Sequence, residues 1–426
     1  MNTASERFTP RREWLILVTL AGIQFTHILD FMIIMPLSPQ LIRVLQIDTH
    51  QFGLLLSSYT FSAAISGLLA ATYVDRFDRR KLVLGLYALF IIATLCCGLA
   101  QTFPQLLIAR ALAGAFGGIL GAMVQTMVAD LIPFERRGKA MGTIMAAFSL
   151  STVAGVPLGL LLANHLPSLG WRAPFFFIVL LALIIFCIGY KMLPSLTGHM
   201  HRQRSGNIFQ QILLVAKNPA HLRGFGFISL MMMGGFTVIP YVALYFTANV
   251  GLPESFITLA YLCGGVATFF TSQLIGRMAD RFGKLRVFCC VAAASLLPIL
   301  VTTHLGPVAR WIVLIDWTIF FILVPGRMVP AMAMVSAIAP PQDRGTFMSL
   351  IASVQMAASG AASLIAGLII SRTASGQIAH YNRVGYLAVG CTLLAMMIAP
   401  WLRVAVVPTP RHENLPVAPT LPESTV

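Results

Sequence analysis

The chain carries two copies of one charged motif, and each copy stands between two long apolar runs. The first copy reads Asp-Arg-Phe-Asp-Arg-Arg-Lys from Asp75, and the second reads Asp-Arg-Phe-Gly-Lys-Leu-Arg from Asp280, 205 positions later (280 − 75). A further pair of similar segments, 133–138 and 340–345, has an offset of 207 (340 − 133). Two matches at nearly the same offset predict a tandem repeat of two halves, which is typical of membrane transporters.

The composition places both halves in a membrane. Of the 426 residues, 58% are hydrophobic and 10% are charged, whereas soluble domains are about 25% charged. Lipid cannot satisfy free backbone groups, so spans of about 20 apolar residues must be helices. Twelve candidate spans lie near residues 14–38, 52–73, 82–102, 104–132, 140–166, 173–192, 221–249, 255–276, 285–304, 311–338, 346–371 and 384–407. We therefore predict an all-α membrane protein with twelve transmembrane helices in two pseudo-symmetric six-helix bundles.

The distribution of the positive charges predicts the orientation. The net charge of +15 would also suit a nucleic-acid partner, but 22 Lys and Arg residues lie in one set of loops and 5 in the other. Cytoplasmic loops carry such an excess. We expect both termini in the cytoplasm, no nucleic-acid partner, and a multi-pass protein of the plasma membrane, which is the inner membrane in a bacterium. The first span lacks a cleavage site, so we expect it to be retained.

Four segments follow from this pattern. We predict an N-terminal bundle at 1–192, a cytoplasmic linker at 193–220, a C-terminal bundle at 221–407 and a disordered Pro-rich tail at 408–426. Apolar residues at helical spacing within the linker predict an amphipathic helix that lies on the membrane surface. The alternative is an unstructured tether between the two bundles. Its apolar residues are Ile208, Phe209, Ile212, Leu213 and Ala216.

No metal or cofactor is expected. His199 and His201 could form a metal pair, but a solvated basic loop explains them as well. All seven cysteines lie in apolar spans, and their spacing fits neither zinc nor a disulfide framework.

The repeated motif resembles motif A of the major facilitator superfamily, Gly-x-Leu-Ala-Asp-Arg-x-Gly-Arg-Lys, and the resemblance covers residues 14–407. The second copy, 276–284, fits that pattern, whereas the first has Ala71 and Asp78 where the family has glycine. Since Asp tolerates a left-handed turn better than most residues, we expect the loop to form at Asp78 as well.

Two further motifs resemble the drug/sugar:proton antiporter, or efflux, branch of that superfamily. The segment 110–114, which begins at Arg110, resembles motif B, and 155–159 resembles the exporter motif C. The resemblance implies alternating access and proton-coupled antiport. Gly155 and Gly159 share one helical face and Pro157 bends the helix, so this seam either seals one face against leak or simply packs tightly.

Charges inside the predicted spans are expensive and mark candidate sites. Asp30 is the only carboxylate near the membrane middle, so it is the candidate proton carrier. With a rise of about 1.5 Å per residue, Arg110 differs from Asp30 in depth by about 6 Å and Arg327 by about 10 Å. Arg110 is therefore the better partner, although boundary errors leave Arg327 open. His27, one turn before Asp30, either shares the proton or is a packing residue.

A substrate cavity is expected between the halves. The segment 325–330, Pro-Gly-Arg-Met-Val-Pro, predicts a break in the tenth span, with unwound backbone beside a fixed cation. The aromatic candidates could equally be packing residues. The candidate cavity residues are Gln24, Phe31, Phe236, Tyr241, Asp316 and Arg327.

The motif A loops are candidate gates. Acids among basic residues can form an interdomain lock present in one conformation, or the charges can merely set topology. The candidate gating residues are Asp75, Arg76, Arg79, Asp280, Arg281 and Gly283.

These features favour a secondary active transporter, a proton-coupled antiporter that exports a small organic molecule such as a drug, sugar or metabolite. Its expected partners are that molecule, protons and membrane lipid, and the expected state is a monomer. The alternatives are a facilitator or proton symporter for uptake, and a membrane receptor or enzyme. The sequence shows no nucleophile–base pair, metal spacing or phosphate loop, so we expect no enzyme.

Overall fold

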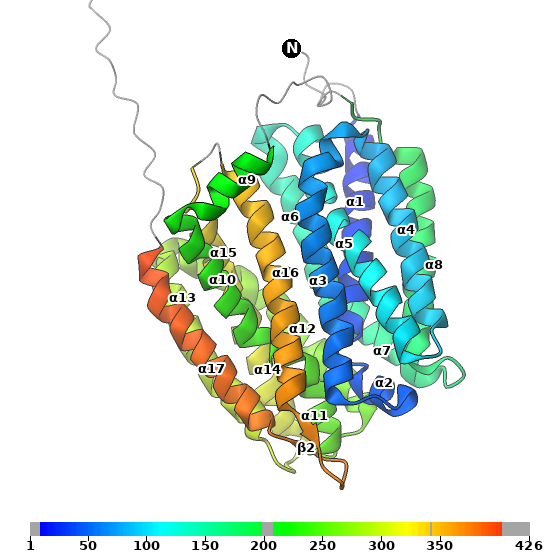
Figure 1. Ribbon diagram of the computed structural model, residues 1–426, viewed down its shortest axis with the longest axis vertical. Helices are drawn as coiled ribbons and strands as arrows, with labels where there is room; N and C mark the ends of the chain where they lie inside the picture. Colours follow the sequence, from blue (N-terminus) through cyan, green and yellow to red (C-terminus); the bar gives the residue numbers. More distant parts are fainter. Residues whose placement is uncertain (1–8, 198–207, 341–342, 403–426) are drawn as a thin grey trace, which may run out of the picture.

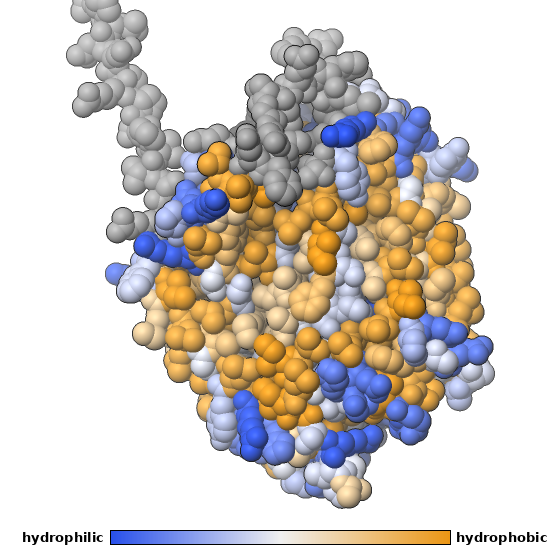
Figure 2. Space-filling view, viewed as in Figure 1, coloured by the Kyte–Doolittle hydropathy of each residue, from blue (hydrophilic) through white to orange (hydrophobic). Residues whose placement is uncertain are grey.

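Each predicted span forms a helical segment in the computed structural model, which describes residues 9–197, 208–340 and 343–402. Within these residues, 12 helical spans are long and apolar enough to cross a membrane. Apolar side chains dominate the middle of the visible face, and hydrophilic ones gather toward its two ends (Figure 2). Leu180 and Leu297, for example, are 61% and 70% exposed, as expected for side chains that face lipid rather than water.

The two halves contain six spans each, and three of the described spans contain two α-helices each. The first half comprises α1 (Pro10–Ile33), α2 (Ser38–Leu45), α3 (Thr49–Tyr73), η2 (Val74–Arg76), α4 (Arg79–Leu99), α5 (Phe103–Leu131), α6 (Phe134–Leu150), η3 (Ser151–Gly155), α7 (Val156–His165), η4 (Gly170–Arg172) and α8 (Ala173–Met192). The second half comprises α9 (Ile208–Lys217), α10 (Pro219–Phe236), η5 (Ile239–Tyr241), α11 (Val242–Ala248), α12 (Glu254–Phe282), α13 (Lys284–His304), α14 (Arg310–Gly326), α15 (Met328–Ser336), α16 (Arg344–Ile369), β1 (Ser371–Arg372), β2 (Ile378–Ala379), α17 (Tyr381–Ile398) and η6 (Ala399–Trp401).

The halves meet along α3 and α16, which lie side by side (Figure 1). We call the end of the molecule with α9 the α9 end. The opposite end, with α2, α11 and the paired strands β1 and β2, is the α2 end (Figure 1). Small residues allow the close contact, because a Cβ at Gly53 would lie 3.0 Å from Ser363 O and one at Gly67 would lie 3.5 Å from Ser353 Oγ.

The helix boundaries correct two predictions. The second motif A is not a loop throughout, since α12 continues to Phe282 and the chain turns only at Gly283, which has a φ of 94°. The tenth span is not unwound at 325–330. Arg327, between α14 and α15, keeps helical angles (φ −63°, ψ −19°), and its N–H donates to Leu323 O at 3.1 Å. The prolines therefore disturb this helix without freeing a stretch of backbone.

The fifth span changes its winding next to Pro157. Residues Ser151–Gly155 form a π-helical turn, and α7 begins directly after it. Since proline has no N–H to donate, a local change of hydrogen-bond pattern is expected beside it. The helix predicted in the linker is present as α9, which packs against α10 and α16. His199, His201 and the tail 408–426 lie outside the described residues.

Candidate functional site: a buried ion pair and an interdomain cavity

Asp30 of α1 and Arg110 of α5 form an ion pair inside the N-terminal half. Arg110 Nη1 donates to Asp30 Oδ2 at 2.9 Å and to the Asp30 backbone oxygen at 3.0 Å. Neither side chain has exposed surface. The guanidinium also lies 4.3 Å from the ring centre of Tyr59, in a cation–π contact. The preferred partner of Asp30 in the sequence is thus its partner in the structure.

Glycines of α5 make room for this arrangement. A Cβ at Gly114 would overlap the backbone of Tyr59, and one at Gly121 would lie 3.1 Å from His27 Nε2. The smooth face of α5 therefore lets α3 and the His27 ring approach closely. His27 lies one turn before Asp30, and its Nδ1 has no hydrogen-bond partner among the described residues.

A cavity of about 410 Å³ lies between the two halves. Residues of α1, α6 and η3 form one wall, and residues of α10, α12, α14, α15 and α16 form the others. His27 and Phe31 line it, whereas Asp30 and Arg110 are not among its described lining residues. The cavity therefore borders the helix that carries Asp30, and His27 is the titratable group of that helix that faces it.

Four of the six predicted cavity residues line this space, namely Gln24, Phe31, Phe236 and Arg327. Phe31 joins the halves, because its ring lies 6.0 Å from that of Phe236 and 5.4 Å from that of Tyr59.

The other two predicted cavity residues lie elsewhere. Tyr241 is fully buried at the seam of the α2 end, where its hydroxyl donates to Ser363 O at 2.9 Å and to Thr49 O at 3.3 Å. Asp316 accepts a hydrogen bond from the Thr302 hydroxyl at 2.6 Å, inside the C-terminal half. Both side chains are held by contacts between helices and do not line the cavity.

The sequence prediction missed several cavity residues. They include Tyr261, Thr268, Phe320, Phe321, Gln355, Met356 and Ser359. One usable signal was present, since Phe320 and Val324 precede Arg327 by seven and three residues and therefore share its helical face. The sequence of α12 and α16 contains no similar signal for the residues that line the cavity.

Arg327 is the cation of the second half. It is 1% exposed, and its Nη1 donates to Thr392 Oγ1 at 2.8 Å and to Ser295 Oγ at 3.2 Å. Both partners are neutral hydroxyls. Within the described chain no carboxylate forms an ion pair with Arg327, so this positive charge is compensated by dipoles alone.

The α2 end is sealed by contacts between the halves. Gln40 Nε2 and Arg43 Nη1 of α2 each donate to a Glu254 carboxylate oxygen of α12 at 2.9 Å. Thr49 Oγ1 donates to Ile370 O at 2.7 Å. The glycines of motif C serve a different contact, because a Cβ at Gly155 would lie 2.9 Å from Leu29 Cδ1 and one at Gly159 would lie 2.7 Å from Ile33 Cδ1. They hold α7 against α1 of the same half.

Gly265 is the point where α12 meets the fifth span, and its replacement should open the α2 end. A Cβ there would lie 3.0 Å from Thr152 O and 3.0 Å from Val153 Cα, both backbone atoms that cannot move aside cheaply. We expect Gly265→Val to lengthen the distance between spin labels at positions 166 and 308 of a cysteine-free variant. Gly276→Val is the matched control on the same helix, because its Cβ would meet only Val329 Cγ1 at 3.7 Å. An unchanged distance distribution in Gly265→Val would contradict this account of the seal.

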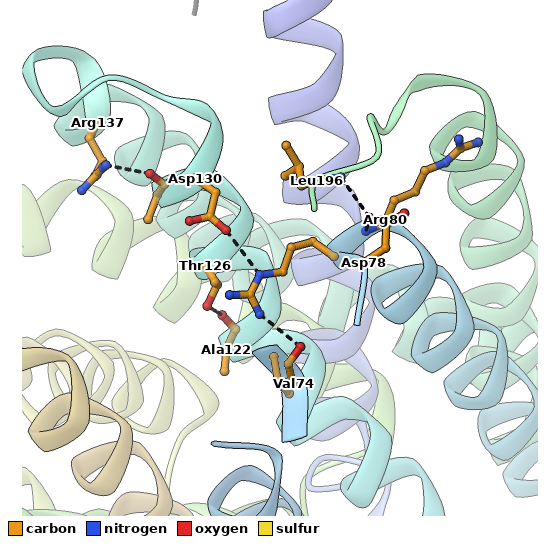
Figure 3. A network of polar contacts seen from close by, with 10 residues as sticks. Val74, Asp78, Arg80, Ala122, Thr126, Asp130, Arg137 and Leu196 are labelled. Atoms are coloured by element: carbon orange, nitrogen blue, oxygen red, sulfur yellow. Dashed lines mark hydrogen bonds and ion pairs between the residues drawn. The ribbon is translucent and has the colours of Figure 1, made fainter. Parts of the chain in front are cut away.

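The first motif A loop is held within its own half. Arg79 is buried and its Nε donates to Asp130 Oδ2 of α5 at 3.3 Å, a contact within the N-terminal half. Its part in an interdomain lock stays a prediction. Asp78 corrects one prediction, because its φ of −57° is not left-handed. It caps α4 by accepting from Arg80 N, and it also accepts from Leu196 N (Figure 3). The Ser195 hydroxyl donates to its other carboxylate oxygen. Asp thus replaces the usual glycine by tying the segment after α8 to the start of α4.

The hydrogen bonds that the Asp78 carboxylate accepts should depend on pH. Partial burial raises the pKa of Asp78, but hydrogen bonds from Leu196 N, Ser195 and Arg80 N and the nearby Lys81 charge lower it, and the net pKa lies below its ordinary value. Its stabilising contribution is therefore present above the unfolded pKa of about 3.9 and is lost as pH falls through the folded value.

Asp78→Ala should weaken the start of α4 by about 1 kcal/mol, because it removes an N-cap. We expect faster hydrogen–deuterium exchange at Leu196 and Arg80 at neutral pH. Asp48→Ala removes another Asp N-cap, at α3, and should leave both amides unchanged. Equal exchange at Leu196 in wild type and Asp78→Ala would show that the tie is not formed.

The other gating residues lie at the α9 end. Arg76, Asp280 and Arg281 are exposed, and Gly283 provides the left-handed turn between α12 and α13. The side chain of Asp75 lies outside the described residues.

The sequence profile of the Major Facilitator Superfamily matches residues 20–219 and 224–424, which together include all twelve spans except the start of the first and residues 220–223 of the seventh. The chain belongs to the major facilitator superfamily. It is therefore a multi-pass membrane transporter and not an enzyme.

Solved structures share the fold of this superfamily member. The inward-open xylose transporter XylE from E. coli has a TM-score of 0.72 at 18% identity, over 93% of this chain and 97% of that one. The nucleoside transporter NupG has a TM-score of 0.72 at 10% identity, over 91% and 99%. A bacterial homologue of the human lysosomal transporter Spinster, inward-facing and occupied, has a TM-score of 0.68 at 16% identity, over 93% and 95%. These identities are low, so the similarity shows a common fold and leaves the substrate to be inferred from the cavity.

Proposed function

We propose that this protein is a proton-coupled antiporter that exports a small organic molecule across the plasma membrane by alternating access. The observation that carries the proposal is the Asp30–Arg110 ion pair, which has no exposed surface and lies on the helix that borders the interdomain cavity. A buried acid with one cationic partner changes its proton affinity whenever the partner moves or water enters. Small molecules, protons and lipid are its partners, and it acts as a monomer.

His27 supplies the connection between cavity and carrier. It lines the cavity one turn before Asp30, and its Nδ1 is free to accept or donate within the described structure. A proton can therefore pass between the cavity and the Asp30 region when α1 and α5 separate slightly. In this scheme substrate entry and protonation exclude each other, because both require the space next to His27.

We assign the α9 end to the cytoplasm, because the loops that carry most Lys and Arg, including Arg76, Arg136 and Arg281, lie there. The α2 end, which is sealed by contacts between the halves, is then external, as expected of an inward-facing state. Both chain termini are cytoplasmic in this orientation.

A proton symporter or facilitator for uptake is the second candidate, since the compared structures include a D-xylose–proton symporter with a TM-score of 0.74. Purified protein in liposomes with a pH-sensitive dye inside separates the possibilities. A panel of drugs, sugars and nucleosides is added outside, without a pH gradient. Antiport raises the internal pH, symport lowers it, and facilitated transport leaves it unchanged. Symport or uncoupled uptake would refute the proposal.

The lock at the α9 end belongs, in this scheme, to the outward-facing state. Asp280 is exposed here, as a residue that pairs only in the other state would be. Asp280→Asn should therefore lengthen the distance between spin labels at positions 139 and 285 under conditions that populate both states. Asp343→Asn, at the same end but outside motif A, is the matched control. If both variants match wild type, these loops serve topology alone.

A further inference from the structure

Arg327 gives the cavity a positive charge that nothing in its walls balances. Among the described residues that line it, Arg327 carries the only formal charge, and none is Asp or Glu. The Asp30 carboxylate does not compensate it, because Asp30 lies outside the lining and is already paired with Arg110. Asp316 precedes Arg327 by eleven positions on the same span, about 16 Å along a helix.

The guanidinium also has unused hydrogen-bond capacity. Nη1 is satisfied by Ser295 and Thr392, but Nε and Nη2 have no partner among the described residues. Gly234 keeps room beside Nη2, since a Cβ at that position would lie 3.0 Å from this atom. A buried cation with free N–H groups is strongly unfavourable unless an anion or acceptor meets it.

The other residues that line the cavity indicate the chemistry of the part of the ligand that does not contact Arg327. The aromatic rings of Phe31, Phe236, Tyr261 and Phe321 surround the space. Met231, Met232 and Met328 add side chains that adapt to different shapes. Polar atoms are few on the α1 wall. Two of them, Gln24 Oε1 and His27 Nδ1, have no hydrogen-bond partner among the described residues. A volume of about 410 Å³ suits a small organic molecule.

We propose that the substrate is an amphipathic organic monoanion, whose carboxylate binds Arg327 while its aromatic or aliphatic body lies among the cavity rings, and that lipophilic cations are excluded. This inference names the substrate class of the antiporter proposed above. A guanidinium fits a carboxylate in a two-pronged geometry, and such charge-assisted bonds are stronger than neutral ones. A cation would instead meet the Arg327 charge between mostly apolar walls, where like charges repel more strongly than in bulk water.

Equilibrium dialysis tests the proposal with three probes that share one ring system. They are radiolabelled indole-3-acetate, indole-3-acetamide and tryptamine, which are an anion, a neutral molecule and a cation at pH 7.5, and empty micelles correct for partitioning. Wild-type protein in detergent should bind the anion about tenfold or more tightly than the other two. Absence of anion binding, equal binding of all three, or preference for tryptamine would overturn the proposal.

Variants of Arg327 test whether this residue causes the preference for the anion. Arg327→Gln should abolish the preference for indole-3-acetate and leave indole-3-acetamide binding nearly unchanged, and Arg327→Lys should retain part of it. Arg383→Gln removes an exposed arginine far from the cavity lining and should match wild type. Persistence of the anion preference in Arg327→Gln would assign it elsewhere and refute the role of Arg327. The measurement needs no transport, so a failed antiport assay and a failed charge preference remain separate results.

Discussion

Asp30→Asn is expected to abolish proton-driven transport in liposomes while leaving substrate binding and substrate exchange measurable. Asn has nearly the shape of a protonated Asp but cannot bind or release a proton. Because Asp30 is fully buried and paired only with Arg110 in the described structure, no exposed carboxylate can take its place. Proton flux on addition of substrate should fall to the level of empty liposomes.

Asp316→Asn is the matched control for this change. It neutralises the other buried carboxylate of the spans, which bonds to Thr302 within the C-terminal half and does not line the cavity. We expect it to keep proton coupling. Full coupling in Asp30→Asn would refute the carrier role, and loss of coupling in Asp316→Asn alone would move that role to the second half.

Arg110→Ala should be the most destabilising single change of the site. It leaves the Asp30 carboxylate in a buried space without its cation and also removes the contact with the Tyr59 ring. Breaking one side of a buried ion pair costs about 3–5 kcal/mol. Thermal unfolding in detergent should show a clear fall in midpoint, whereas Arg383→Ala, an exposed arginine, should change it little.

The double variant provides the sharper measurement. Arg110→Ala with Asp30→Asn removes the unpaired charge, so it should be more stable than Arg110→Ala alone. Contacting residues show non-additivity of about 0.5–3 kcal/mol in such cycles. Strictly additive losses would mean that the ion pair does not stabilise the protein, whatever its geometry.

Hydropathy determined the number of spans, and the repeated charged motifs at offsets of 205 and 207 determined their division into two halves. This information is local, because each span needs only enough consecutive apolar residues to cross the bilayer. The pairing of Asp30 with Arg110 could also be predicted, since depth along a helix follows from residue number. Residue type in the spans, meaning charged, polar or aromatic, selected six cavity candidates, and four of them, Gln24, Phe31, Phe236 and Arg327, line the cavity.

Side-chain direction was decided only by the tertiary structure. Tyr241 and Asp316 were predicted to line the cavity, but the first bonds across the seam between the halves and the second bonds to Thr302. Asp78 likewise ties two distant segments together, because Ser195 and Leu196 supply hydrogen-bond donors from more than a hundred residues away.

The sealed end has the same origin. Glu254 accepts hydrogen bonds from Gln40 and Arg43 of the other half, and no local sequence pattern predicts such a contact. The sequence by itself determined what each helix is and how deep its charges lie. Which face of a helix meets the cavity, and which end of the cavity is closed, depend on contacts between halves about 200 positions apart, and only the folded chain brings those together.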